Sequence, residues 1–163
     1  MPTATATATT SPSPEETEPA EPAPTLPPKP AAMSEETEEG AIATVRYFIE
    51  AVNMAYATND PSYFENLATD DCGSCGDIAE TIRTAREQKQ AFEDYELVLG
   101  EIEKSGPMDE GWFAVKADVT QDRLLVRNSD GSVSSREPAP TRTSTVFVLD
   151  FTDGQWLLKG FVV

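Results

Sequence analysis

The chain has 163 residues, and its 29 acidic and 12 basic side chains give a formal net charge of −17 with no histidine. Nucleic-acid binding needs a cationic surface that displaces counterions from phosphates, so this composition argues against it. An anionic membrane surface would repel the chain for the same reason. The lack of histidine removes the commonest general base and the commonest metal ligand, so we expect neither a metal nor a cofactor.

The first 33 residues differ in composition from the rest of the chain. They consist almost wholly of Thr, Ala, Pro, Ser and Glu, and they hold nine of the 13 prolines. Such a segment cannot bury enough apolar surface to offset its ordering entropy, and its prolines favour an extended polyproline II conformation. We therefore predict a disordered, semi-stiff spacer over residues 1–33 and one domain over residues 34–163. A tail without function is the alternative.

Three helices are predicted at the start of the domain. Residues 34–60 open with acidic side chains, which suit a helix N-terminus, and close with an Asn-Asp-Pro stop. A short helix over 61–68 begins with proline in its first turn. A third helix covers 77–91, with Asp77 as its predicted N-cap. Three- and four-residue spacing places one set of apolar residues on the inner faces of the first and third helices: Ala41, Val45, Phe48, Ile49, Val52, Tyr56, Ile78, Ile82 and Ala85.

After Phe92 the sequence changes to the alternating pattern of β-strands. Strands are predicted over 95–105, 112–127, 132–137, 141–152 and 155–163, with tight turns at "NSDGS" and at "DG". Pro138 and Pro140 fall where a sheet edge would tolerate them. Alternation places one set on the same face as the core: Phe113, Val115, Ala117, Val119, Thr143, Thr145, Phe147, Leu149 and Phe151.

Helices followed by antiparallel strands predict an α+β fold in which the helices cover one face of a curved sheet. The stretches "EGAIATVRYFIEAVNMAYATND", "LATDDCGSCGD" and "DGQWLLKGF" resemble a family of actinobacterial exported lipoproteins with a nuclear-transport-factor-2-like, or SnoaL-like, cone fold. That resemblance covers about residues 39–163 and implies helices packed into a strongly bent antiparallel sheet. The spacer also resembles the segment that follows the lipid-modified cysteine of such lipoproteins.

Cys72 and Cys75 are the two cysteines of the chain, and three interpretations of them are open. A redox dithiol would need a stabilised thiolate, which the neighbouring Asp70, Asp71 and Asp77 oppose. A zinc site needs four ligands, so two thiols without histidine would need Asp70, Asp71 or a second subunit to complete the set. A structural disulfide in an exported domain is the interpretation that we favour.

Aromatic residues provide the candidate ligand site. Tyr56, Trp112, Phe147, Phe151 and Trp156, together with Tyr47 and Tyr63, can line the mouth of the cone and hold a small apolar ligand. Aromatic residues in alternating strands, however, more often form plain core.

A catalytic alternative comes from the resembled fold, in which some isomerases and dehydratases combine an Asp base with a Tyr donor. Asp118, Asp150 and Tyr56 are the matching residue types. Strand alternation, however, places Asp118 with Lys116 on the face away from the predicted core.

These patterns favour a non-catalytic binding or interaction domain. We expect it to be exported to the outer face of the cytoplasmic membrane or the cell envelope and held there only through a lipid anchor that this sequence does not contain. Its expected partner is a small ligand or an envelope protein. An isomerase-like or dehydratase-like enzyme is the alternative from another class, and a homodimerising module is the third.

Overall fold

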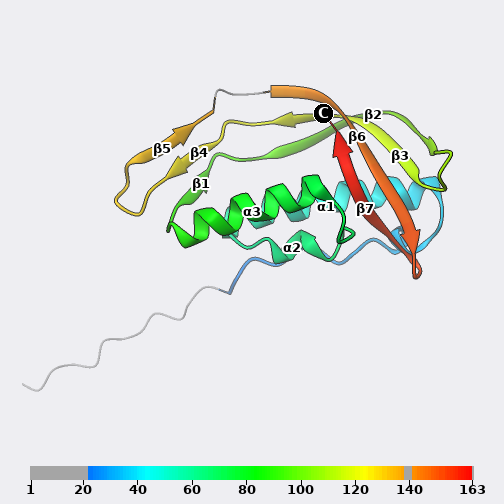
Figure 1. The fold of residues 1–163 in the computed structure, drawn as a ribbon, viewed down its shortest axis with the longest axis horizontal. Helices are drawn as coiled ribbons and strands as arrows, with labels where there is room; N and C mark the ends of the chain where they lie inside the picture. Colours follow the sequence, from blue (N-terminus) through cyan, green and yellow to red (C-terminus); the bar gives the residue numbers. More distant parts are fainter. Residues whose placement is uncertain (1–21, 138–140, 163) are drawn as a thin grey trace, which may run out of the picture.

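The computed structural model describes residues 22–137 and 141–162 (Figure 1). Residues 1–21, Pro138 and Pro140 lie outside the described residues, as do the predictions made for them. Within the described ranges the helical elements precede the strands, as predicted. The elements are η1 (Ala31–Ser34), α1 (Glu38–Thr58), α2 (Ser62–Glu65), α3 (Gly73–Glu87), β1 (Ala91–Glu93), β2 (Leu97–Pro107), β3 (Phe113–Gln121), β4 (Leu125–Arg127), β5 (Val133–Arg136), β6 (Thr141–Thr152) and β7 (Gln155–Val162).

Helix α1 is the long central helix, and its ends follow local sequence rules. It begins where the Thr37 side chain accepts a hydrogen bond from the Gly40 amide at 3.0 Å, which satisfies one of the free donors of the first turn. It ends at Asn59, whose left-handed backbone (φ 53°) closes the last turn. All six predicted inner residues of this helix are buried, which confirms its predicted face.

Helix α3 begins earlier than predicted, so the assignment of Asp77 as its N-cap is wrong. Cys72 occupies that position, and its sulfur accepts a hydrogen bond from the Cys75 amide at 3.3 Å. The loop between the cysteines is itself the first turn of the helix, and Asp77 lies in the turn that follows. The sequence rule failed because it ranks Asp above Cys as a cap, whereas the disulfide loop sets the start of this helix.

The strands form two antiparallel sheets, one in the order β2-β3-β6-β7 and one in the order β1-β4-β5. The predicted strand over 112–127 is therefore two strands, because β3 and β4 belong to different sheets. Both predicted turns are present, and the β6–β7 turn uses the positive φ angles of Asp153 (54°) and Gly154 (77°) that such two-residue turns require. Strand β1 was not predicted.

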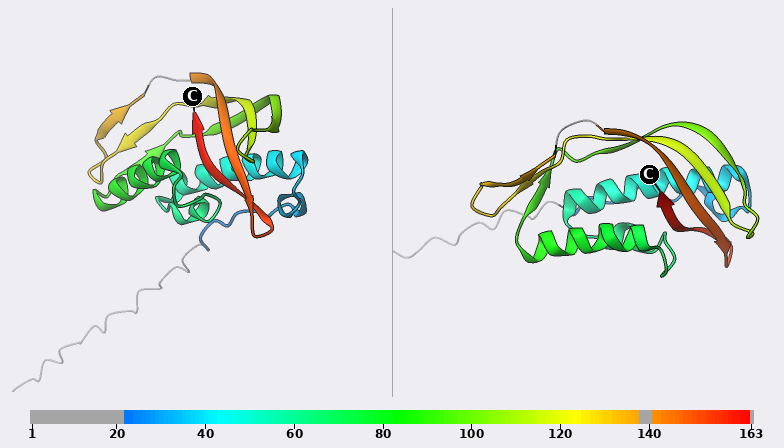
Figure 2. Two further views of the ribbon diagram at one scale, coloured as in Figure 1. Left: turned by 45° about the vertical axis from the view of Figure 1, so that its right-hand side comes forward. Right: turned by 45° about the horizontal axis from the view of Figure 1, so that its top comes forward.

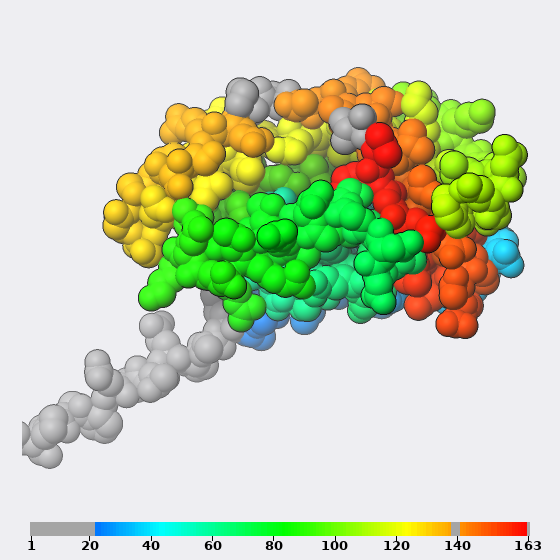
Figure 3. Space-filling view, in the orientation of Figure 1, coloured from blue at the N-terminus to red at the C-terminus, as the bar shows by residue number. Residues whose placement is uncertain are grey.

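The four-stranded sheet bends around α1, and α3 lies beside that helix, as the two views of Figure 2 show. A register irregularity between Leu99 and Ile102 of β2 contributes to this bend, because a bulge increases the local twist of a strand. Helix α3 packs against β7, and the two lie side by side in Figure 3. These layers confirm the predicted fold class, with helices packed on a strongly curved antiparallel sheet.

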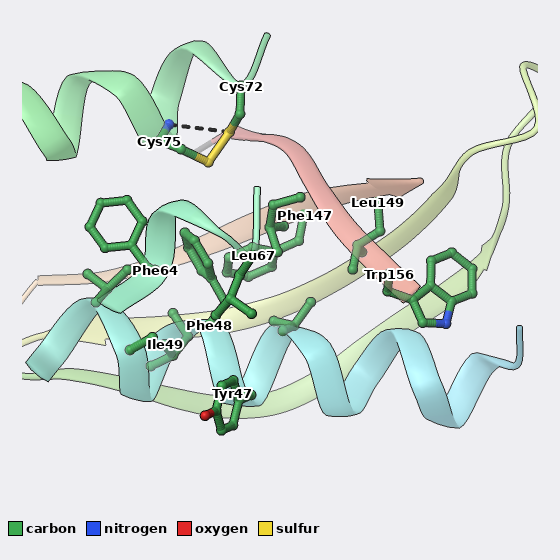
Figure 4. Close-up of a cluster of buried hydrophobic side chains, with 14 of the residues drawn as sticks. Tyr47, Phe48, Ile49, Phe64, Leu67, Cys72, Cys75, Phe147, Leu149 and Trp156 are labelled. Atoms are coloured by element: carbon green, nitrogen blue, oxygen red, sulfur yellow. Dashed lines mark hydrogen bonds between the residues drawn. A yellow bond between two sulfur atoms is a disulfide. The ribbon is translucent and has the colours of Figure 1, made fainter. Parts of the chain in front are cut away.

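The hydrophobic core lies between α1 and the concave face of the sheet (Figure 4). Phe48 of α1 meets Phe64 of α2 edge to face, with ring centroids 5.7 Å apart. Val115 of β3 pairs with Phe147 of β6, and both are buried. The predicted inner faces of these two strands are therefore confirmed along the middle of the sheet.

The described residues before α1 make specific contacts with the domain. The Tyr63 and Tyr47 hydroxyls donate hydrogen bonds to the carbonyls of Pro24 (2.7 Å) and Pro27 (2.9 Å). Met33 in η1 is buried with 6% of its surface exposed. These contacts cross the boundary predicted at residue 33, so packing against the domain begins before Ser34.

Candidate functional site

A cavity of about 230 Å³ lies between α1 and the concave face of the four-stranded sheet. Most of its wall is apolar and comes from α1, α3 and all four strands of that sheet. Its lining residues are Phe48, Ile49, Tyr56, Ile78, Tyr95, Leu97, Val119, Gln121, Thr143, Thr145, Phe147 and Phe161. Apolar cavities of about 150 Å³ hold a benzene ring, and pockets for larger ligands start at about 300 Å³. This cavity therefore has room for a small, ring-sized molecule.

Hydrogen-bonding side chains in the lining give an otherwise apolar cavity directional contacts. Gln121 of β3 and Thr143 of β6 contribute an amide and a hydroxyl, and the Thr143 and Thr145 hydroxyl oxygens lie 3.4 Å apart. The Gln121 amide also donates to the Glu137 carboxylate at 3.3 Å. Such groups fix the orientation of a bound molecule, while the apolar wall supplies most of the binding free energy.

Tyr56 of α1 and Tyr95, just before β2, stack on each other with ring centroids 3.8 Å apart. Burial raises the pKa of Tyr56, and burial together with the neighbouring Tyr56 raises the pKa of Tyr95. Both phenols therefore stay protonated at neutral pH. They can donate a hydrogen bond to a ligand, but they cannot supply a phenolate base.

Local sequence fixes the position of this tyrosine pair. The Asn53 side chain of α1 donates to the Leu97 carbonyl at 2.9 Å and accepts from the Leu97 amide at 2.8 Å, as a neighbouring strand would. Asp94 takes the left-handed backbone (φ 59°) that turns the chain from β1 into β2. These two features hold Tyr95 over Tyr56. No motif in the sequence indicated Tyr95 as part of the site.

A second, open groove of about 910 Å³ lies on the other side of this tyrosine pair. Tyr56 and Tyr95 line both the groove and the cavity, so the stacked pair is the wall between them. Leu26 and Pro27 line the groove from the N-terminal segment. Acidic side chains outnumber basic ones along it: Glu50, Asp94, Glu96, Asp122 and Arg123. An anionic ligand would be repelled from this groove.

The five aromatic residues named as a candidate ligand pocket are divided by the structure. Tyr56 and Phe147 line the cavity. Trp156 packs edge to face against Phe151, with ring centroids 5.1 Å apart, and its indole donates to the Glu35 carbonyl at 2.7 Å. Trp112 lies under the Lys159 ammonium, 5.0 Å from its ring centroid. These three residues are not part of the cavity lining.

The Asp–Tyr arrangement expected for an isomerase-like site is not formed. Asp118 is ion-paired with Arg142 on the outer face of the sheet. Asp150 of β6 projects to the same face, because it alternates with the buried Leu149. Tyr56 lies on the concave side. The sheet therefore separates both carboxylates from Tyr56, so the three residues of the catalytic alternative do not share a site.

Cys72 and Cys75 form a disulfide at the start of α3, as predicted, with their Cα atoms 5.3 Å apart. Only 4% of the surface of each residue is exposed. Between them, the Ser74 hydroxyl accepts a hydrogen bond from the Phe161 amide of β7 at 3.0 Å. The loop thus attaches α3 to the sheet edge, and its burial fits a structural role better than that of an exposed reactive thiol.

Within residues 22–137 and 141–162, no group of three or more Cys, Asp or Glu side chains is arranged to hold a metal ion. In the same part of the chain, none of the helices combines the length and apolar character needed to cross a bilayer.

Comparison with solved structures places this arrangement among known folds. The intermembrane-space region of the chloroplast protein ARC6 aligns over 79% of this chain and 97% of its own length, with 8% identity and a TM-score of 0.56. Aln2 from a Streptomyces species aligns over 74% and 87% (15% identity, TM-score 0.47). A protein with a cystatin-like fold from Caulobacter vibrioides aligns over 74% and 86% (15% identity, TM-score 0.46). At these identities the similarity concerns the fold alone.

Sequence comparison assigns the chain to a protein family but not to an activity. No curated protein matches the chain significantly. A family model described as a family of unknown function (DUF6318) matches residues 11–161, which is most of the sequence and includes both the cavity and the disulfide. The chain therefore belongs to the DUF6318 family.

Proposed function

We propose that this chain is a non-catalytic domain that binds a small, uncharged, ring-containing ligand in the cavity between α1 and the sheet. The observation that carries the proposal is the cavity itself, which combines an apolar wall with the Tyr56, Gln121 and Thr143 hydrogen-bonding groups. A well-formed apolar cavity with a few convergent polar groups is the usual form of a small-molecule site.

The chemical class of the ligand follows from size and charge. The volume of about 230 Å³ fits one ring with small substituents. The protonated Tyr56 and Tyr95 phenols favour a ligand with a hydrogen-bond acceptor. A carboxylate or phosphate would lose its hydration inside an apolar wall, which is unfavourable.

We further propose that the domain is exported and tethered at a cell surface, as in the actinobacterial lipoproteins that its sequence resembles. The disulfide supports this proposal, because disulfides persist in oxidising compartments and are rare in the cytosol. We also propose that the domain binds an envelope protein or forms a homodimer. Sedimentation equilibrium of the full chain tests the dimer.

The binding proposal is tested with a panel of neutral monocyclic probes and one bicyclic probe, such as phenol, acetophenone and indole, in an NMR titration of the full chain. Saturable shifts of the Tyr56, Tyr95 and Phe147 signals are expected. Thr145→Leu fills the cavity from β6 and should abolish these shifts. Ser144→Leu, its neighbour on the outer face of the same strand, is the matched control and should keep them. Unsaturable shifts, or equal loss in both variants, would refute the proposal.

A further inference from the structure

The N-terminal segment that lies on the domain is rich in proline. Among residues 22–30, those at 22, 24, 27, 28 and 30 are prolines. Pro30 has φ −56° and ψ 137°, which is polyproline II geometry. A polyproline II segment makes no internal hydrogen bonds, so each of its carbonyls needs water or another external donor. The domain supplies two such donors, the hydroxyls of Tyr47 and Tyr63.

The spacing of these two contacts matches the period of the polyproline helix. Polyproline II has three residues per turn, so carbonyls three residues apart point in the same direction and lie about 9 Å apart. The two accepting residues, Pro24 and Pro27, are separated by this interval. The donors come from different elements, Tyr63 from α2 and Tyr47 from α1. Two helices thus present a pair of hydroxyls to carbonyls three residues apart in the segment.

Apolar contact completes the arrangement. Leu26, between the two accepting residues, packs against the core cluster. Tyr47 is buried at 6% exposure, although it projects from α1 on the side away from Phe48 (Figure 4). Aromatic-lined grooves are a recurring means by which extended proline-rich segments are recognised.

We propose that Tyr47 and Tyr63 form a binding site for an extended proline-rich segment, which residues 24–30 of this chain occupy in cis. The site accepts the same segment in trans when the resident one is displaced. Leu26 and Pro27 also line the groove beside Tyr56, so the resident segment shapes one wall of that groove. This inference does not depend on the proposed ligand cavity.

The test releases the resident segment from the site and then adds a free peptide of the same sequence. Leu26→Asp in the full chain places a charge against the core and should release residues 24–30. A synthetic peptide of residues 22–33 is then titrated while the ring signals of Tyr47 and Tyr63 are followed by NMR. A short linker gives an effective concentration of about 1 mM or more, so the peptide is supplied up to several times that level.

Saturable shifts are expected in the Leu26→Asp chain, with binding at least tenfold weaker in the unaltered chain because its site is filled. Adding Tyr47→Phe and Tyr63→Phe to the Leu26→Asp chain should weaken binding at least fivefold. A peptide carrying the same Leu26→Asp change is the matched control and should not bind. Failure of the folded Leu26→Asp chain to bind, or equal binding by both chains, would overturn the proposal.

A second measurement needs no variant. In the unaltered chain, the backbone ¹⁵N heteronuclear NOE of Leu26 and Lys29 should equal that of α1, because the segment is docked. Values typical of a free chain at both residues would overturn the proposal even if the Leu26→Asp chain did not fold.

Discussion

Gly40→Ala should destabilise this protein, although the same change inside a helix normally stabilises it. Gly40 lies in the first turn of α1, where η1 and the residues after it pass close to the helix. A Cβ atom there would come within 2.3 Å of the Glu35 carbonyl oxygen, 2.5 Å of the Ala32 carbonyl oxygen and 2.9 Å of the Trp156 indole nitrogen. Two of these three atoms belong to the backbone, so the N-terminal segment has to move away from the helix.

The expected magnitude follows from what that movement disrupts. The Trp156 indole loses its hydrogen bond to Glu35, which contributes about 1 kcal/mol. Met33, which is 6% exposed, loses part of a burial that contributes about 1.5–3 kcal/mol. Alanine restores at most about 1 kcal/mol of helix propensity at Gly40. The free energy of unfolding should therefore fall by about 1–2 kcal/mol.

Gly76→Ala is the matched control, because Gly76 lies in α3, is exposed and has no atom within 4 Å of the place that an added Cβ would occupy. That change should raise the free energy of unfolding by about 0.5–1 kcal/mol. Urea unfolding followed by tryptophan fluorescence measures both variants. A Gly40→Ala chain as stable as the Gly76→Ala chain would show that the segment before α1 does not pack as described.

Three further predictions follow from the disulfide, the tyrosine pair and Asn53. Removing the Cys72–Cys75 disulfide should lower the free energy of unfolding by about 2 kcal/mol, as urea unfolding can measure. The variant with Cys72→Ser and Cys75→Ala keeps an N-cap oxygen, so it should lose about 1 kcal/mol less than the variant with alanine at both positions. Equal losses would mean that the cap at residue 72 contributes nothing. Since burial raises the pKa values of Tyr56 and Tyr95, the unfolded chain releases these protons near pH 10 while the folded chain retains them. The free energy of unfolding should therefore fall as the pH rises above about 10, and Tyr95→Phe should make that fall shallower; an unchanged slope would contradict the shift. Asn53→Ala removes two hydrogen bonds to the β2 backbone and should lower the free energy of unfolding by about 1–3 kcal/mol in the same urea assay, so a loss below about 0.5 kcal/mol would show that these bonds do not hold the strand.

The spacing of apolar residues correctly predicted which side of α1, β3 and β6 faces the core. The apolar spacing along α1 predicted its inner face, since all six residues named for it are buried. Alternation predicted that Val115, Ala117 and Phe147 face the core. The "DG" turn is where its residues predicted it. For the helix and the strands, the sequence pattern and the structure share a period, and the turn depends on two adjacent residues, so no distant contact was needed to decide these outcomes.

The start of α3 and the division of the 112–127 strand depend on contacts that local pattern does not contain. Cys72 caps α3 because its disulfide loop forms the first turn, so a rule based on ordinary cap residues chose Asp77 instead. Strand β4 leaves β3 because it pairs with β1 and β5 in a separate sheet. The 112–127 segment is divided because its two parts pair with different strands elsewhere in the chain. Alternation within one strand carries no information about such partners.

By itself, the sequence determined the α+β class, the inner face of α1 and the two cysteines that form the disulfide, because each depends on residue type and short-range spacing. Only the tertiary structure decided which aromatic residues share a cavity. The bend of the sheet brings Tyr56 and Phe147 together, adds Tyr95 from the β1–β2 connection, and leaves Trp112, Phe151 and Trp156 outside the cavity lining. Sheet curvature and strand order are properties of the assembled chain, so the composition of the site became definite only when distant segments were packed.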